Sequence, residues 1–407
     1  MTTVQSHVES HQVDIYDPDW YLGDTVHETF AELRRTDPVH WQDMPGEPGY
    51  WAVLRHADLV HVARHPEIFS AWLGSVVLED LDPERLDMMR HMLLVMDPPQ
   101  HTSYRQPLAP NFTPRVIGRM QEQIRNRCRA ILALAGEKGE LDFAHEVAGP
   151  LPAQIIAEIM GLPQEDTGRI QRWAEVQTSG QDDEIAGSYE GNASVEMAMY
   201  GIEWAAKRRA EPHRDDITSL LLETTFEDGQ PMSDVDFGSF FVQLVTAGND
   251  TTKTMMSSGT HQLILHPDQM RALRADPSLV PAAVEEMLRY CNPLHYFRRT
   301  ATQDTELGGK QIKAGDKVAM YYTSANRDDE VFPDAQRFDI RRTPNPHLSF
   351  GIGAHFCLGA HLARLEAKIF FEELLSTFRT IELTGEPVKI RSNLNNGFKR
   401  MPVRLTR

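Results

Sequence analysis

The segment that most constrains the fold of this chain runs from Phe350 to Gly359 and reads Phe-Gly-Ile-Gly-Ala-His-Phe-Cys-Leu-Gly. Gly351 and Gly353 allow the backbone to adopt positive φ and to pass close to a bulky neighbour. Apolar residues at helical spacing follow, and they predict a helix that continues towards Phe378. Cys357 is therefore predicted at a helix N-terminus, where unpaired N–H groups and the helix dipole favour an anion and lower the pKa of a thiol.

Four interpretations of Cys357 compete. A nucleophilic pair with His355 is disfavoured, because side chains two residues apart in a tight loop project poorly for a hydrogen bond. A zinc site with His347, His355 or His361 lacks a second cysteine at the usual spacing. An inert buried thiol is the usual state of a single cysteine, but it leaves the glycines unexplained. A thiolate beneath a large planar cofactor accounts for all these features, because haem iron accepts an axial cysteine thiolate.

The remaining patterns predict a mostly helical body with a smaller β portion. The longest helix is expected from Ser233 to His266, with Ser233 and Asp236 as a variant capping box and Pro267 as its stop. Strands are expected at residues 50–53, 301–312, 317–322, 388–390 and 403–405. No internal repeat or Gly/Ser linker divides the chain, so we expect one continuous domain over residues 1–407.

Composition excludes several classes of protein. The 407 residues carry a formal net charge of −18, which disfavours a nucleic-acid binder, because affinity for phosphates depends on clustered positive charge. Three cysteines cannot form the framework of a small disulfide-rich protein. No stretch approaches the ~20 apolar residues that span a bilayer, and residues 1–12 are too polar for a signal peptide. We therefore expect a cytoplasmic protein that binds neither nucleic acid nor membrane.

Around the cysteine, the chain resembles a known family. Phe350, Gly353, Cys357 and Gly359 match the Phe-x-x-Gly-x-x-x-Cys-x-Gly loop of the cytochrome P450 family in its soluble bacterial form. The resemblance implies the P450 fold, mainly α with a smaller β portion, in a single triangular domain with a long central helix over the haem. It also implies heme b (iron protoporphyrin IX) as cofactor and Cys357 as the proximal iron ligand. Phe350 would shield the sulfur, Gly359 would let the helix approach the porphyrin, and Gly351 would lie against the cofactor.

The segment from Thr246 to Thr252 interrupts the apolar run of the long helix. A glycine weakens a helix and threonine hydroxyls bend it by bonding to preceding carbonyls, so a kink without chemistry is one interpretation. The segment also resembles the family's oxygen-activation motif. That resemblance implies that Ala247 and Gly248 lie against the haem, that Thr251 holds dioxygen and its protonating water, and that Asp250 relays protons from solvent.

Haem carries two propionates, which need cationic or hydrogen-bonding partners. The resemblance assigns this task to His101, Arg105, Arg299 and His355. The adjacent Arg298 leaves the choice between the two neighbouring arginines open. A solvated surface charge is the alternative for each residue alone, whereas the set at family spacing favours the haem site.

A charged pair precedes the cysteine loop in the sequence. Glu286 and Arg289 lie three residues apart on one face of a predicted helix. They resemble the family's Glu-x-x-Arg motif, and Arg337 would complete a structural cluster that fixes the segment leading to the cysteine loop.

The resemblance also nominates residues that face the substrate. Most of them are apolar, so the expected substrate is an apolar small molecule of terpenoid, steroid or lipid type, with ordinary core packing as the alternative for each residue. The nominated positions are Leu94, Thr246, Leu294, Tyr296, Phe297 and Phe398.

The implied reaction inserts one oxygen atom from O2 into this substrate. Ferredoxin and ferredoxin reductase are the expected electron donors, because the chain has no dinucleotide-binding motif and no room for a flavin or iron–sulfur domain. The arginines between Arg115 and Arg129 form a candidate basic patch for an acidic ferredoxin. The alternatives are peroxide-driven or isomerase chemistry and a non-catalytic haem carrier or sensor, against which Asp250 and Thr251 favour dioxygen activation.

Overall fold

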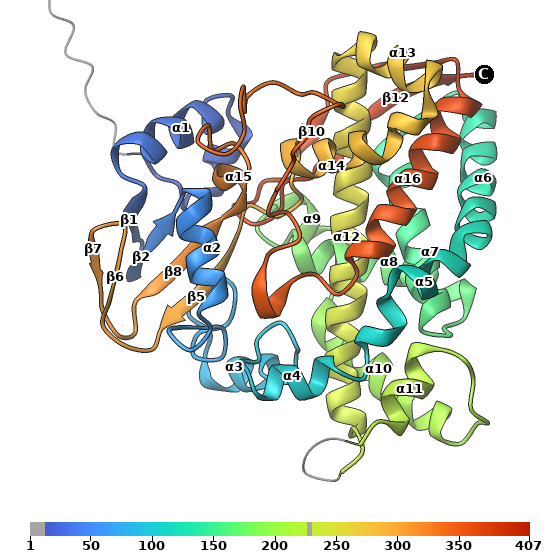
Figure 1. The fold of residues 1–407 in the computed structure, drawn as a ribbon. Coiled ribbons are helices and arrows are strands. Elements are labelled where there is room, and N and C mark those ends of the chain that lie inside the picture. Colours follow the sequence, from blue (N-terminus) through green and yellow to red (C-terminus); the bar gives the residue numbers. More distant parts are fainter. Residues whose placement is uncertain (1–12, 226–229) are drawn as a thin grey trace, which may run out of the picture.

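The long helix α12 (Asp234–Leu265) runs through the middle of the molecule (Figure 1). The computed structural model describes residues 13–225 and 230–407, so the polar segment 1–12 lies outside the described residues. A strand-rich region lies on one side of α12 and most of the long helices lie on the other. The arrangement confirms the predicted fold class, mainly helical with a smaller β portion.

The bounds of α12 follow the sequence signals. Ser233 precedes the first turn, and its hydroxyl oxygen accepts the N–H of Asp236 at 3.0 Å. The helix ends before Pro267, and its α-helical hydrogen bonding continues through residues 246–252. Gly248 has a packing role there, because a Cβ at this position would lie 2.3 Å from Cδ1 of Ile156 on α7.

The other helices surround α12 or cover the sheets. Those of four to seven residues are α3 (Pro83–Met89), α4 (Gln100–Arg105), α5 (Pro114–Ile117), α9 (Asp183–Gly187), α11 (Ile217–Glu223) and α15 (Tyr322–Ala325). The longer ones are α1 (Val26–Thr36), α2 (His56–Arg64), α6 (Gln121–Lys138), α7 (Pro150–Ile159), α8 (Thr167–Thr178), α10 (Ala193–Arg209), α13 (Pro267–Ala275), α14 (Val280–Tyr290) and α16 (Ala360–Thr377).

The largest sheet has the strand order β1-β2-β8-β5-β3, and β2 and β8 are its parallel pair. Its strands are β1 (Val39–Met44), β2 (Glu47–Val53), β3 (Phe69–Ser70), β5 (Tyr296–Ala301) and β8 (Lys317–Tyr321). The smaller sheets contain β4 (Glu140–Asp142), β9 (Thr380–Leu383) and β12 (Pro402–Thr406), then β6 (Thr305–Leu307) with β7 (Lys310–Ile312), and β10 (Val388–Lys389) with β11 (Phe398–Arg400).

The strand signal predicted over residues 301–312 corresponds to more than one strand. The chain forms the hairpin β6–β7 there, because Gly308 and Gly309 both adopt positive φ, at 55° and 77°, and reverse its direction. The other late strands occur close to their predicted bounds.

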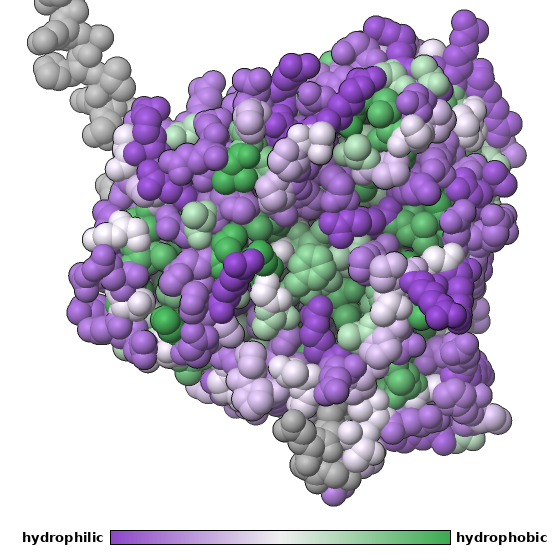
Figure 2. Space-filling view, in the orientation of Figure 1, coloured by the Kyte–Doolittle hydropathy of each residue, from purple (hydrophilic) through white to green (hydrophobic). Residues whose placement is uncertain are grey.

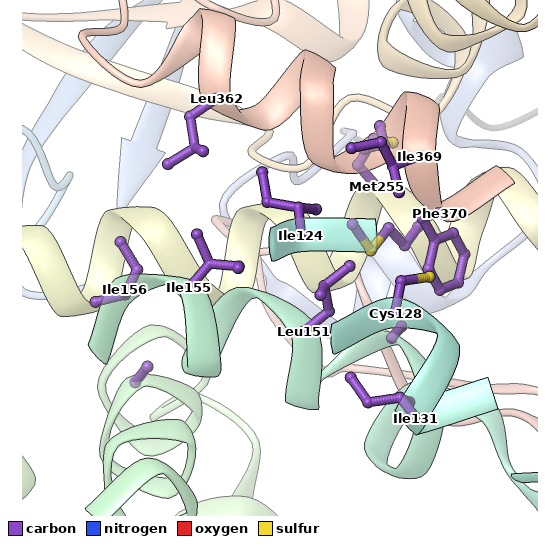
Figure 3. Packing of buried hydrophobic residues seen from close by; sticks show 14 of the residues in the cluster. Ile124, Cys128, Ile131, Leu151, Ile155, Ile156, Met255, Leu362, Ile369 and Phe370 are labelled. Atoms are coloured by element: carbon purple, nitrogen blue, oxygen red, sulfur yellow. The ribbon is translucent and has the colours of Figure 1, made fainter. Parts of the chain in front are cut away.

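The helical core is packed from residues far apart in the sequence. Figure 3 shows Cys128 of α6 beside side chains of α7, α12 and α16, among them Leu151, Met255 and Phe370. Burial raises the pKa of the Cys128 thiol to about 12, and that of Cys291 to about 12 as well. Both are therefore neutral core thiols, which leaves Cys357 as the cysteine at the cavity.

Candidate functional site

A cavity lies between α12 and the loop that precedes α16. Its walls come from α4, α7, β5, α12, α16 and the cysteine loop, and most of the side chains that line it are apolar. Figure 2 shows apolar surface at the centre of this face of the molecule, with polar residues around it. Within that loop, Phe356 keeps 37% of its surface exposed.

The cysteine loop places Cys357 at the wall of this cavity, just before the first turn of α16. Gly351 and Gly353 have φ of 66° and 77°, as predicted for this segment. The N–H of Cys357 donates to the carbonyl of Phe350 at 2.8 Å and closes the loop. A Cβ at Gly353 would lie 2.5 Å from the carbonyl oxygen of Ala63 on α2, so the bulky neighbour of this glycine is α2.

The pKa of the Cys357 thiol is raised, contrary to the prediction. Burial is the largest cause, and it outweighs the lowering effects of the Gly359 N–H and of the Arg105 and Arg364 guanidinium groups. The helix N-terminus therefore does not produce a thiolate by itself. A bound metal ion would favour the thiolate, because a coordinating thiol loses its proton.

Phe350 lines the cavity beside Cys357. The guanidinium of Arg364 lies 4.4 Å from the centre of the Phe350 ring, and Arg364 is itself paired with Glu285 at 2.7 Å. Stacking against a cation that is already paired holds the ring in place beside the sulfur.

Two histidines and two arginines gather on another side of the cavity. His101, Arg105, Arg299 and His355 all line it, as predicted. The rings of His101 and His355 lie 4.4 Å apart, and the Nε2 atom of each is buried without a hydrogen-bond partner. Burial lowers the pKa of His101 to about 4 and that of His355 to about 2.

The two neighbouring arginines face opposite sides of the sheet. On β5, alternate side chains point to opposite faces, and Arg299 faces the cavity. Arg298 points away from it and pairs with Asp80 at 2.9 Å while also donating to the carbonyl of Leu78 at 3.0 Å.

These residues fit a haem group. The sulfur of Cys357 is a suitable axial donor, and the two orphaned imidazole nitrogens beside Arg299 suit a carboxylate. Gly359 also lines the cavity, and a Cβ built on it meets no atom within 4 Å, which leaves open space at the first turn of α16. Residues 13–225 and 230–407 contain no group of three or more His, Cys, Asp or Glu side chains that could hold a metal ion, which disfavours the zinc interpretation.

The α12 wall presents Ala247, Gly248, Thr251 and Thr252 to the cavity. The Thr251 hydroxyl donates to the carbonyl of Ala247 at 2.8 Å. Asp250 does not line the cavity: it is buried on another face of α12, where its carboxylate accepts the Thr178 hydroxyl at 2.7 Å.

Two charged residues near Asp250 were missed by the sequence analysis. Lys253 is buried between Asp250, at 2.8 Å, and Glu175 of α8, at 3.1 Å. The spacing of Asp250 and Lys253, three residues apart on one helix, is a signal that could have revealed this pair. The position of Glu175 carried no such signal.

Half of the nominated substrate positions line the cavity, namely Leu94, Leu294 and Phe297. Thr246, Tyr296 and Phe398 are not among the described residues that line it. Tyr296 lies on the opposite face of β5, where its hydroxyl accepts the N–H of Leu78 at 3.3 Å, and Phe398 packs edge-on against His261. Sequence reasoning missed Gln243, Leu244 and Glu366, which do line the cavity.

A buried ion cluster is centred on Glu286, whose carboxylate pairs with Arg289 at 2.7 Å, as predicted. Its third member is Arg342, whose Nε lies 3.2 and 3.1 Å from the two carboxylate oxygens of Glu286. The prediction of Arg337 is wrong, because its side chain is 69% exposed and only its backbone carbonyl accepts from Arg289.

The predicted basic patch is also smaller than the sequence suggested. Arg125 pairs with Glu372 at 2.8 Å and with Glu373, and Arg129 pairs with Glu373 at 2.8 Å. Only Arg115 and Arg119 of this series are exposed without an ion pair to a described residue.

The chain is similar to proteins of known family along almost its entire length. The family model for cytochrome P450 matches residues 195–405. A steroid C26-monooxygenase of Mycolicibacterium smegmatis is 39% identical over 93% of this chain and 90% of its own length. A methyl-branched lipid omega-hydroxylase of Mycobacterium tuberculosis is 39% identical over 94% of this chain and 92% of its own length.

Solved structures share the fold. A cytochrome P450 of Mycobacterium marinum in complex with pseudoionone superposes with a TM-score of 0.89 at 35% identity, and the match covers 98% of this chain and 100% of that chain. A Bacillus megaterium protein in complex with testosterone superposes with a TM-score of 0.84 at 29% identity, over 95% of this chain and 99% of that one. Among the described residues, no helix is both long and apolar enough to cross a membrane.

Proposed function

The chain belongs to the cytochrome P450 family, and we propose that it inserts one oxygen atom from O2 into a steroid, terpenoid or lipid-like molecule with electrons from a ferredoxin system. As a P450 monooxygenase it is an oxidoreductase that uses a haem iron and acts on apolar substrates. We further propose that the cofactor is heme b and that residues 1–407 form one domain.

The observation that carries the proposal is the composition of one cavity. Its walls combine the Cys357 sulfur, the side chains of His101, His355 and Arg299, and the Thr251 hydroxyl with a mostly apolar lining. An apolar pocket with a few convergent polar groups is the usual form of a small-molecule site.

Haem bound to a thiolate supplies the electron-rich iron at which dioxygen is activated. We propose that Cys357 ligates this iron and that Arg105, Arg299, His101 and His355 hold the propionates. The unpaired Nε2 atoms support this assignment, because a buried polar atom without a partner costs about 1–3 kcal/mol unless a ligand satisfies it.

We assign proton delivery to Thr251 and Asp250. Thr251 lines the cavity, as Thr252 does, and the hydrogen bond from its hydroxyl to the Ala247 carbonyl fixes its orientation there. Asp250 is the adjacent acid, and its ion pair with Lys253 holds it on the face of α12 that meets α8. In this proposal Thr251 acts at the cavity wall, and Asp250 exchanges protons with the polar groups on the other face of α12.

Product analysis tests the proposed function. Purified holoprotein with a ferredoxin, its reductase and NADH should oxidise a steroid, terpene or branched lipid that shifts its haem spin state. The Thr251→Ala variant should keep substrate binding but consume electrons without forming product, whereas the neighbouring Thr252→Ala variant should remain coupled. Product formation without an electron donor would refute the proposal in favour of peroxide-driven or isomerase chemistry.

The ferredoxin proposal rests on Arg115 and Arg119. Changing either to glutamate should slow reduction by an acidic ferredoxin, and the effect should fade as ionic strength rises. Arg337→Glu is the matched control on another exposed segment. An unchanged rate in the Arg115 and Arg119 variants would refute the assignment of this surface.

A further inference from the structure

One polar side chain on the α12 wall has no part in the roles assigned above. Gln243 lines the cavity, and its Oε1 accepts the N–H of Leu94 at 3.3 Å. Within the described residues, its amide nitrogen donates no hydrogen bond. Because the Leu94 N–H donates to Oε1, the oxygen of the Gln243 amide faces the loop that contains Leu94. The NH2 group of the amide is therefore available to donate to a ligand.

The surroundings of this amide are apolar. Phe240 and Leu244, close to Gln243 on α12, line the cavity, and so do Leu93 and its neighbour Leu94, whose N–H Gln243 accepts. Burying a hydrogen-bond donor among apolar side chains costs free energy unless an acceptor pairs with it. An oxygen atom of a bound molecule can supply that acceptor.

The position of Gln243 along α12 relates it to the site of oxidation. It lies one turn before Ala247 and two turns before Thr251, which corresponds to about 6 and about 12 Å along the helix axis. A substrate oxygen bound by Gln243 would therefore be displaced by roughly 6–12 Å along the α12 axis from the atom that reacts near Ala247 and Thr251.

We propose that Gln243 determines specificity by donating a hydrogen bond to a carbonyl or hydroxyl oxygen of an elongated, otherwise apolar substrate, so that oxidation falls on a carbon remote from that oxygen. The inference rests on the proposed function and narrows its substrate class. It requires a molecule with a polar group at one end and a hydrocarbon portion that reaches the haem.

The test compares two ligands and three forms of the holoprotein. The ligands are a methyl ketone with a thirteen-carbon chain and the hydrocarbon tridecane, and their dissociation constants are measured by calorimetry and by the haem spin-state shift. The proteins are the wild type, Gln243→Met, which keeps the side-chain volume, and Leu244→Met, a control that alters the same wall without removing a polar group.

The Gln243→Met variant should bind the ketone about 3- to 10-fold more weakly and bind tridecane with unchanged affinity. Leu244→Met should change both affinities by the same factor. Equal weakening of both ligands in Gln243→Met would refute the inference, because the residue would then only position Leu94, and so would unchanged affinity for both. These dissociation constants are measured without turnover. A failed oxidation assay would therefore count against the proposed function but would not change the outcome of this binding test.

Discussion

Replacing Arg342 with alanine should lower the free energy of unfolding by about 3–5 kcal/mol, because it breaks a buried ion cluster. Glu286 is fully buried, and the Nε of Arg342 lies 3.2 and 3.1 Å from its two oxygens. Arg342 also donates to the carbonyls of Pro333, Asp334 and Arg337, at 2.6, 3.2 and 3.0 Å. Arg289 remains beside Glu286 in the variant, which places the expected loss near the lower end of that range.

The comparison with Arg337 makes the reasoning specific. Its side chain is 69% exposed and lies 4.0 Å from Asp339, so Arg337→Ala should change stability by less than about 0.5 kcal/mol. The backbone carbonyl that accepts from Arg289 and Arg342 survives this substitution. Arg341→Ala, at an exposed neighbouring position, controls for the loss of one positive charge in the same segment.

Urea unfolding of the three holoproteins, followed by tryptophan fluorescence, measures these differences, and haem content reports on the cysteine loop. Arg342→Ala should also bind haem less completely, because the cluster anchors the segment that leads to Cys357. A loss below about 1 kcal/mol in Arg342→Ala, or an equal loss in Arg337→Ala, would contradict the assignment of Arg342 to the cluster.

Three further predictions follow from the site. Cys357→Ser should abolish the absorption of the CO complex that is characteristic of a thiolate ligand, while circular dichroism shows the same helix content. Burial raises the pKa of Glu366 to about 8, so the folded protein retains a proton that the unfolded chain releases near its ordinary pKa. Urea unfolding at several pH values should therefore show the free energy of unfolding falling as pH rises from 4.5 to about 8, by on the order of 4 kcal/mol in total. The Glu366→Gln variant should lose this pH dependence. Lys253→Met should cost about 3–5 kcal/mol in the same assay, because it leaves the carboxylates of Asp250 and Glu175 buried without their shared cation; a neutral result would show that water already compensates them.

Local patterns predicted the parts of the site that depend on residues close in the sequence. The glycines and the following helix identified the Cys357 loop, and the Ser233 cap and Pro267 stop bounded α12 to within a residue. These features are encoded by backbone conformation and hydrogen bonds within a few residues, so no knowledge of the fold is needed to recognise them.

Tertiary structure decided which way side chains point and which charges meet. Adjacent residues of a strand face opposite sides, so only the placement of β5 showed that Phe297 and Arg299 face the cavity while Tyr296 and Arg298 do not. The Arg125–Glu373 pair joins residues 248 positions apart, and no local pattern predicts such a contact.

For Cys357, local sequence determined its position in the fold, whereas tertiary burial determined its thiol pKa. Its sequence context correctly placed it at the start of a helix, yet its thiol pKa is raised, because burial by distant segments outweighs the local helix N-terminus. The sequence by itself therefore determined the family, the cysteine loop and the central helix. The tertiary structure decided that Arg299 faces the cavity, that Arg342 joins the Glu286 cluster and that Gln243 lines the cavity, because burial and partner choice depend on segments that only the folded chain brings together.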